Sequence, residues 1–229
     1  MRRQVLALAA LILFAAASPT FAEPRSWTVD PDASRLTFQT TQLSAPFDGG
    51  FKSYGADVTF DPDDLAASRV RVEIDVTSID TGNAERDTAA LGPDWFDSAN
   101  HLTALFETTS FTAAGDGRYE ARAKLTIRGE TRDVVLPFTL GISEDQGRTT
   151  AQMSGELTIS RGDFGVGRGQ WAGDGVVGDS VVIRVEITAH AEWPAHQSCA
   201  KPPHALRLSG FSPQPRACAT GPQRSDLAR

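Results

Sequence analysis

The sequence has few of the residues that bind metals or cross-link small exported domains. Its only two cysteines, Cys199 and Cys218, lie near the C-terminus. The preceding residues therefore cannot depend on disulfides or on thiolate metal sites. In an exported protein the pair could form one disulfide, and two free thiols are the equal alternative. Only four histidines occur, and none has a second ligand at metal spacing, so we expect no metal site.

Catalytic signatures are also missing. No Gly-x-Ser-x-Gly elbow occurs, and no serine or cysteine stands beside a histidine in a recognisable catalytic context. Residues 173–178 match the dinucleotide-binding pattern Gly-x-Gly-x-x-Gly. That pattern requires a parallel strand before it and a helix after it, whereas a strand pattern follows it here. We expect a glycine loop, no catalytic residues and no cofactor, and therefore not an enzyme.

The N-terminus carries the one long apolar run. Arg2 and Arg3 precede the run over residues 5–17, and small residues lead up to Glu23. This order is typical of a secretory signal peptide, and the run is shorter than the roughly 20 residues that span a bilayer. We predict a signal peptide over residues 1–22, cleaved near Ala22. No cysteine follows the run, so a lipoprotein anchor is not supported.

Charge is unevenly distributed along the chain. The formal net charge of −7 becomes −9 without Arg2 and Arg3. Residues 194–229 have six prolines, no strand period and a net charge of +4, which leaves −13 on residues 23–193. We predict that this Pro-rich basic tail is disordered. An acidic domain repels phosphate backbones, which argues against nucleic acid as a partner.

Apolar and polar residues alternate throughout residues 23–193. From Tyr119 to Ile127 the odd positions are apolar and the even ones polar, and residues 70–76, 153–159 and 181–189 repeat the pattern. Such alternation is typical of strands with one buried face. Turn signals separate the strands; they lie at residues 48–50, 61–64, 115–117 and 144–147. The pattern predicts an all-β domain, an antiparallel sheet closed as a barrel or a sandwich.

One insertion interrupts the strands. Residues 83–91 favour a short helix that stops at Gly92. Trp95 and Phe96 follow on a connection, where they would plug a barrel end or anchor the helix. The glycines at 165, 167 and 169 suggest bulges or a bent strand.

The apolar face of the predicted strand that begins at Tyr119 includes the small residues Ala121 and Ala123. Small wall residues leave room that leucine or phenylalanine would fill. A barrel of about eight strands is either filled by side chains or holds one ligand. The residues alone leave a solid core and a lipid cavity equally open.

Several segments together resemble the YceI-like family of periplasmic polyisoprenoid-binding proteins. They occur in the family's order over about residues 26–192, and comprise Trp27–Asp30 with Ser34–Phe38, Phe47–Phe51, Ile79–Asn83 with Arg86 and Asp87, Asp94–Asp97, Leu125–Pro137 and Arg161–Gly165. Two positions depart from the family pattern, because Ala33 stands for a frequent histidine and Asn100–Leu102 for a Tyr-Pro pair.

The resemblance implies a single lipocalin-like antiparallel barrel over residues 23–193, located in the periplasm. Its lumen would hold a long isoprenoid chain such as a polyprenyl phosphate or a quinone tail, so that the protein acts as a carrier or sequestering protein. Fatty acids or their amides are other amphiphiles that the resemblance allows, and a membrane b-type cytochrome is an implied partner. A homodimer is a further possible assembly.

Seven aromatic residues are our candidates for lipid contact, and each has plain core packing as its alternative. Five would form the wall or mouth: Phe38, Phe106, Phe138, Phe164 and Trp171. Trp95 and Phe96 would form the cap. The rival functions are a barrel that binds a protein partner in envelope stress or respiration, and an enzyme acting on a bound lipid.

Overall fold

The protein is described by a computed structural model that covers residues 25–145, 148–173 and 175–191. The predicted signal peptide (1–22) and tail (194–229) lie outside the described residues. The elements in chain order are β1 (Ser26–Val29), β2 (Arg35–Gln42), β3 (Ala45–Phe51), β4 (Tyr54–Thr59), β5 (Arg69–Asp75), the 3-10 helix η1 (Val76–Ser78), β6 (Ile79–Asp80), α1 (Ala84–Ala90), β7 (Thr103–Gly115), β8 (Arg118–Ile127), β9 (Glu130–Asp145), β10 (Arg148–Ser160), η2 (Arg161–Phe164), η3 (Gly169–Trp171) and β11 (Ser180–Ala191).

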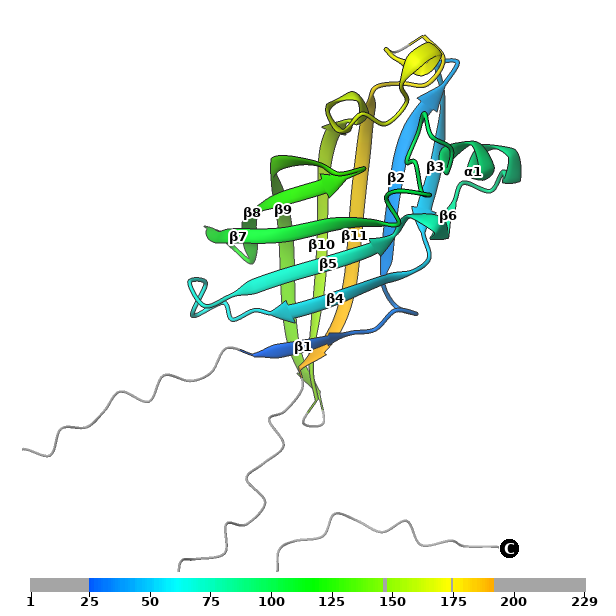
Figure 1. Cartoon of the computed structure of the whole chain (residues 1–229). Coiled ribbons are helices and arrows are strands. Elements are labelled where there is room, and N and C mark those ends of the chain that lie inside the picture. Colours follow the sequence, from blue (N-terminus) through cyan, green and yellow to red (C-terminus); the bar gives the residue numbers. More distant parts are fainter. Residues whose placement is uncertain (1–24, 146–147, 174, 192–229) are drawn as a thin grey trace, which may run out of the picture. The chain divides into compact units, whose positions relative to one another are not determined.

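Eight strands form a closed antiparallel barrel (Figure 1). Neighbours pair in the order β1-β4-β5-β7-β8-β9-β10-β11, and β1 also pairs with β11, which closes the ring. β2, β3 and β6 extend the sheet from β11. This topology confirms the prediction of an all-β barrel of about eight strands with a short helical insertion.

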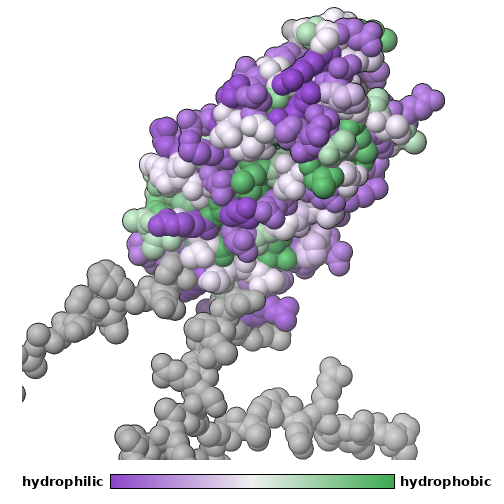
Figure 2. All heavy atoms as spheres, in the orientation of Figure 1, coloured by the Kyte–Doolittle hydropathy of each residue, from purple (hydrophilic) through white to green (hydrophobic). Residues whose placement is uncertain are grey.

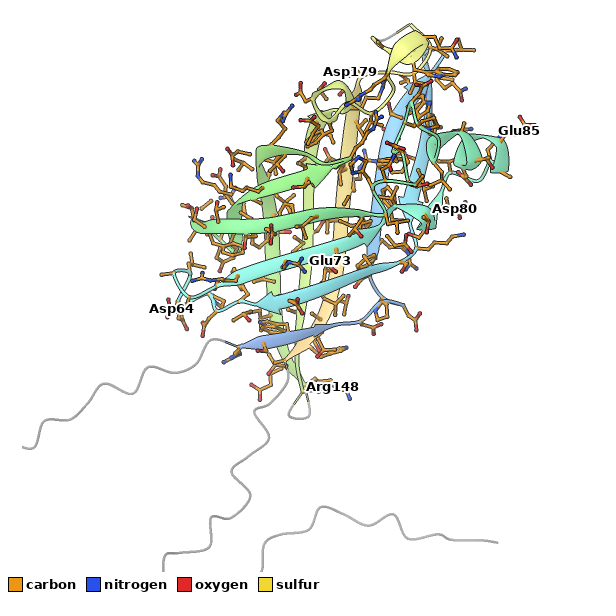
Figure 3. All side chains as sticks on the ribbon, viewed as in Figure 1. Asp64, Glu73, Asp80, Glu85, Arg148 and Asp179 are labelled. Atoms are coloured by element: carbon orange, nitrogen blue, oxygen red, sulfur yellow. The ribbon has the colours of Figure 1, made fainter. Side chains whose placement is uncertain are left out.

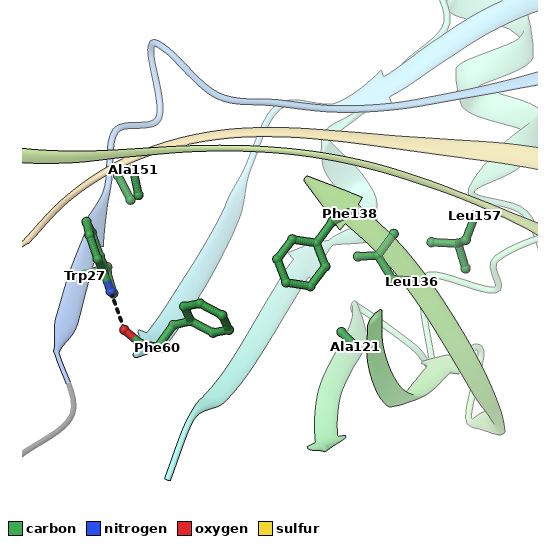
Figure 4. Close-up of a cluster of buried hydrophobic side chains, with 8 residues drawn as sticks. Trp27, Phe60, Ala121, Leu136, Phe138, Ala151 and Leu157 are labelled. Carbon is green, nitrogen blue, oxygen red and sulfur yellow. Dashed lines mark hydrogen bonds between the residues drawn. The ribbon is translucent and has the colours of Figure 1, made fainter. Parts of the chain in front are cut away.

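The alternation in the sequence sets which face of each strand is buried. Along β8, Ala121, Ala123, Leu125 and Ile127 are buried while most residues between them are exposed. Figure 2 shows the result on one outer face, where apolar groups are interspersed among polar ones. Inside, one apolar cluster surrounds Trp27, whose indole Nε1 donates to the Phe60 carbonyl at 2.9 Å (Figure 4).

Three tight hairpins use two-residue turns with both residues at positive φ. They are Asp116-Gly117 between β7 and β8, Arg128-Gly129 between β8 and β9, and Leu43-Ser44 between β2 and β3. Such turns match the right-handed twist of the strands and favour Asn-Gly or Asp-Gly. Leu43-Ser44 is neither of these pairs, so this hairpin could not be predicted from its turn residues.

One predicted turn is wrong. Residues 48–50 lie inside β3, where Gly49 is paired with Phe38 of β2. A Cβ on Gly49 would lie only 2.4 Å from the Phe38 ring. The glycine is therefore present because the Phe38 ring covers the backbone of the next strand.

We expect Leu43→Asn with Ser44→Gly to stabilise the protein. Leu43 has φ 51° and Ser44 φ 66°, a region that costs ordinary L-residues roughly 1–2 kcal/mol each. Relief of this strain should raise Tm by about 2–4 °C for each kcal/mol gained, as measured by thermal unfolding. Gly117→Ala, at φ 71° in another hairpin, is the opposite control and should lower Tm. An unchanged or lower Tm for the double variant would contradict the argument.

The predicted helix is confirmed as α1. The Asn83 side chain caps it by accepting from the Arg86 amide at 2.9 Å, and it ends before Gly92. No helix among the described residues is long and apolar enough to cross a bilayer. α1 buries none of its residues fully, so it lies on the barrel rather than in its core.

Candidate functional site: a cavity inside the barrel

A cavity of about 550 Å³ lies inside the barrel, and residues from all eight barrel strands line it. Its size falls within the roughly 300–1,000 Å³ usual for small-molecule sites. The wall is almost wholly apolar, because the inward faces of the strands carry aliphatic and aromatic side chains. Ala121 is one of the lining residues, as expected for a small residue that leaves space in the lumen.

The seven aromatic candidates all line this cavity. Phe106 and Phe138 project from β7 and β9, and Phe38 projects from β2. Phe164 and Trp171 come from η2 and η3 in the connection between β10 and β11. Trp95 and Phe96 come from the connection after α1. The fold thus brings together residues from six separate segments, and their contact with a ligand remains a prediction.

The two predicted cap residues are held by aromatic contacts. The Trp95 and Trp171 ring centroids are 5.7 Å apart, and the Phe96 and Phe51 centroids are 6.0 Å apart with the rings edge to face. Trp171 lies between β10 and β11, far along the chain from Trp95. The Trp95–Trp171 contact therefore joins two connections that line the cavity, and the Phe96–Phe51 contact joins the first of them to β3.

A second aromatic group packs where β4, β7, β8 and β9 face one another. Phe60 lies edge to face with Phe111, Tyr119 and Phe138, at centroid distances of 5.1, 5.6 and 6.2 Å. Such edge-to-face pairs add about 0.5–1.5 kcal/mol each to simple burial. Phe60, Phe111 and Phe138 also line the cavity, so these contacts pack one part of its wall.

One buried arginine organises the connection between β10 and β11. Arg161 is 4% exposed, and its guanidinium donates to six backbone carbonyls at 2.8–3.2 Å. The acceptors are Val166, Gly167, Trp171, Gly173, Val177 and Gly178. The carbonyl dipoles take the place of water around the charge. Arg161 also lies 5.3 Å from the Trp95 ring centre.

Arg128 fixes the connection that carries the cap. Its side chain is 7% exposed and donates to the carbonyls of Gly165 and Pro93, with Nη2 2.6 Å from the latter. An Asp97 carboxylate oxygen lies 3.9 Å from the same nitrogen. Arg128 belongs to the tight β8–β9 turn, so a rigid hairpin holds the segment that bears Trp95.

Among the described residues of the lining, only Glu85, Arg86 and Arg161 carry charge. None of these described lining residues is an aspartate, a histidine, a cysteine or a serine, so they offer neither paired carboxylates nor a nucleophile with a base. The arrangement suits binding of an apolar chain. The described residues contain no group of three or more potential metal ligands.

Tyr54 is a lining residue whose pKa is raised in the folded protein. Burial raises the pKa of its phenol above the ordinary value, and the nearby Ser34 hydroxyl and the positive charge of Arg35 partly offset this. The phenol oxygen is buried and has no hydrogen-bond partner among the described residues. Its neutral hydroxyl is therefore maintained to higher pH in the folded protein than in the unfolded chain.

Tyr54 should make folding stability depend on pH in the alkaline range. An unfolded tyrosine ionises near pH 10, while folded Tyr54 keeps its proton, so the folded state binds more protons and stability falls as pH rises past about 10. Tyr54→Phe should reduce this fall, as measured by denaturant unfolding at neutral pH and above about pH 10. Identical pH slopes in both proteins would contradict the assignment.

The sequence analysis did not identify Arg86 and Arg161 as lining residues. It also missed three aromatic lining residues: Trp27, Phe47 and Tyr54. Arg86 and Arg161 stand within segments that resemble the family, but nothing in their spacing indicates burial. Trp27 and Tyr54 lie on strands whose inward face was readable. Their aromatic side chains on these inward faces were the signal that could have identified them as lining residues.

Comparison with known proteins agrees with this geometry. The family model for the YceI-like domain matches residues 27–189. A UPF0312 protein of Vibrio cholerae is 28% identical over 153 residues, which cover 65% of this chain and 81% of that protein. A UPF0312 protein of Ectopseudomonas mendocina is 31% identical over 165 residues, which cover 70% and 86%.

Solved structures share the fold. The crystal structure of Burkholderia cenocepacia BcnA superposes with a TM-score of 0.65 at 32% identity, and covers 70% of this chain and 99% of that one. A polyisoprenoid binding domain from Saccharophagus degradans, implicated in plant cell wall breakdown, has a TM-score of 0.55 at 16% identity, with coverage of 75% and 100%. At that identity the likeness concerns the fold alone. The family match spans most of the barrel, and the chain belongs to the YceI-like family.

Proposed function

We propose that this protein carries or sequesters a long-chain isoprenoid lipid, a polyprenyl phosphate or a quinone, inside its barrel. The observation that carries the proposal is the apolar cavity of about 550 Å³ enclosed by all eight strands. The polyisoprenoid binding domain named above has the same fold, which supports an isoprenoid as the cargo.

The physical basis would be burial of a flexible apolar chain. Each buried CH₂ group contributes about 0.8 kcal/mol, and ordering of the chain offsets part of this gain. The aromatic wall would supply affinity without fixing a specific chain position. The seven predicted contact residues come from several strands and connections around the lining, which suits contact with a long ligand.

The remaining parts of the proposal follow from the sequence. An exported chain with a signal peptide over residues 1–22 would act in the periplasm. The lack of a catalytic pair in the lining supports a binding protein rather than an enzyme. Partnership with a membrane b-type cytochrome and formation of a homodimer stay predictions from the sequence.

The test is native mass spectrometry of the full exported chain, purified from its own host without detergent and then extracted with organic solvent. We expect a discrete added mass that extracts as a prenyl lipid or a quinone. A fatty acid or amide as the added mass would overturn the isoprenoid assignment. A bare mass that stays bare after incubation with both lipid classes would overturn the carrier function and favour a protein partner.

A further inference from the structure

The two arginines of the cavity lining differ in how their charge is satisfied. Arg161 donates to six carbonyls and has no capacity left for a ligand. Arg86 of α1 has a buried Nη1 that finds no hydrogen-bond partner among the described residues. A buried donor without an acceptor is destabilising, and more so when it is charged. The described residues therefore leave one hydrogen-bond donor of Arg86 unsatisfied.

The protein nevertheless holds Arg86 in place. Its guanidinium carbon lies 4.0 Å from the centre of the Phe47 ring, a cation–π contact. Asn83 caps the helix through the Arg86 amide at 2.9 Å. Asp87 accepts from the Thr81 amide and hydroxyl at 2.9 and 2.6 Å, which ties the helix to the preceding segment.

Neighbouring acids do not neutralise Arg86. Asp87 is engaged by Thr81. Glu85 is exposed on α1 (Figure 3), although it also borders the cavity, and it makes no ion pair with Arg86 among the described residues. Arg86 itself is half-buried, and its Nη1 is the atom that lies buried without a partner, so this nitrogen would gain most from an anionic oxygen.

We propose that Arg86 binds the head group of the cargo, and that this head is anionic: a phosphate or a carboxylate. The inference rests on the proposed lipid-carrier function and specifies it, because a neutral quinone ring would leave the charge uncompensated. The planar guanidinium matches both oxyanions through paired hydrogen bonds. Thr81, Asn83 and Gln42 lie on the same lining and offer neutral polar groups beside it.

The experiment compares probes with one tail and different heads. Geranylgeranyl phosphate is matched with geranylgeraniol, and palmitate with palmitamide. Affinities are measured by titration calorimetry on the full chain, delipidated first, for the wild type and for Arg86→Met, a substitution that keeps the length and helix propensity of the side chain. The two anionic probes separate a phosphate from a carboxylate source.

We expect Arg86→Met to weaken both anionic probes by about 10- to 100-fold, the scale of a lost charge-assisted hydrogen bond, and to change the neutral probes less than about threefold. Arg86→Lys should recover part of the anion affinity. Arg71→Met, which removes a positive charge from an exposed ion pair with Glu73 and Glu107, should leave all four affinities unchanged.

Several outcomes would overturn the proposal. Equal losses for anionic and neutral probes would make Arg86 a structural residue, and an unchanged phosphate affinity would remove it from the head-group site. Tighter wild-type binding of a quinone of matched chain length would overturn the anionic head. If all the probes fail to bind the wild type, the carrier function itself is wrong. Thermal unfolding of each variant shows whether a loss of binding comes from a loss of folding.

Discussion

Arg161→Met is expected to lower the free energy of unfolding by about 4 kcal/mol or more, at the upper end for single substitutions. The change leaves six backbone carbonyls without their donor. Each buried acceptor that loses its partner costs roughly 1–3 kcal/mol, although water entry recovers part of the total. Methionine fills much of the same volume, so the loss reports hydrogen bonding rather than an empty space.

The measurement is chemical denaturation of the two proteins. Arg184→Met is the matched control, because Arg184 makes an exposed ion pair with Glu156 at 2.9 Å on the outer surface. Exposed pairs are worth about 0–1 kcal/mol, so the control should remain close to the wild type. Similar small losses in both variants would show that the carbonyls around Arg161 are satisfied in other ways.

The hydrogen bonds of Arg161 to six carbonyls also explain why glycines occur in the segment around it. The sequence suggests bulges or a bent strand at Gly165, Gly167 and Gly169. Instead, Gly165 and Gly167 lie between η2 and η3 and Gly169 begins η3, at φ 65°, 79° and 62°. A Cβ on Gly167 would lie 1.9 Å from Arg161 Nη1. The connection wraps closely around one guanidinium, and only a glycine backbone can approach it at that point.

Strands and helix were predictable because their signals are local. The period of two along β8 or β11 reports burial directly, and the helix has a cap residue and a stop residue next to its ends. Phe38, Phe106 and Phe138 of the lining could be predicted for the same reason, since large apolar groups on the inward faces of strands must point into the barrel. Whether the lumen is filled or open depends on how the eight strands close into a barrel. A local sequence pattern carries no information about that closure.

The arginines and the β2–β3 hairpin could not be predicted for a different reason. Arg161 is buried because six carbonyls from a later segment surround it, and Arg86 lines the cavity because Phe47 supports it. Both depend on contacts between distant residues. The Leu43-Ser44 turn is imposed by the pairing of β2 with β3 against the local preference of its residues.

Ala121→Leu is expected to reduce lipid binding at least tenfold while leaving the protein as stable as the wild type or more so. Ala121 is 2% exposed and lines the cavity. The three added carbons would enter the lumen and occupy the path of a bound chain. Removal of open cavity volume itself favours folding, by about 24 cal/mol for each Å³.

Ala123→Leu is the control that distinguishes blocking of the cavity from a general effect of adding carbons to β8. Ala123 is equally buried at 2% and lies two residues along the same face of β8, but it is not a cavity-lining residue. The same added carbons should there overpack a filled region and cost about 1–3 kcal/mol, with binding retained in the folded fraction. Affinity for geranylgeraniol and denaturant unfolding are measured on both variants.

The pair separates an open lumen from a solid core by opposite effects on two measurements. A cavity wall predicts lost affinity with stability kept at Ala121, and lost stability with affinity kept at Ala123. If Ala121→Leu instead destabilises the protein as Ala123→Leu does and the ligand still binds, side chains already fill the barrel beside Ala121. The lipid would then have to bind elsewhere, because no other part of β8's buried face combines a small side chain with contact to the lumen.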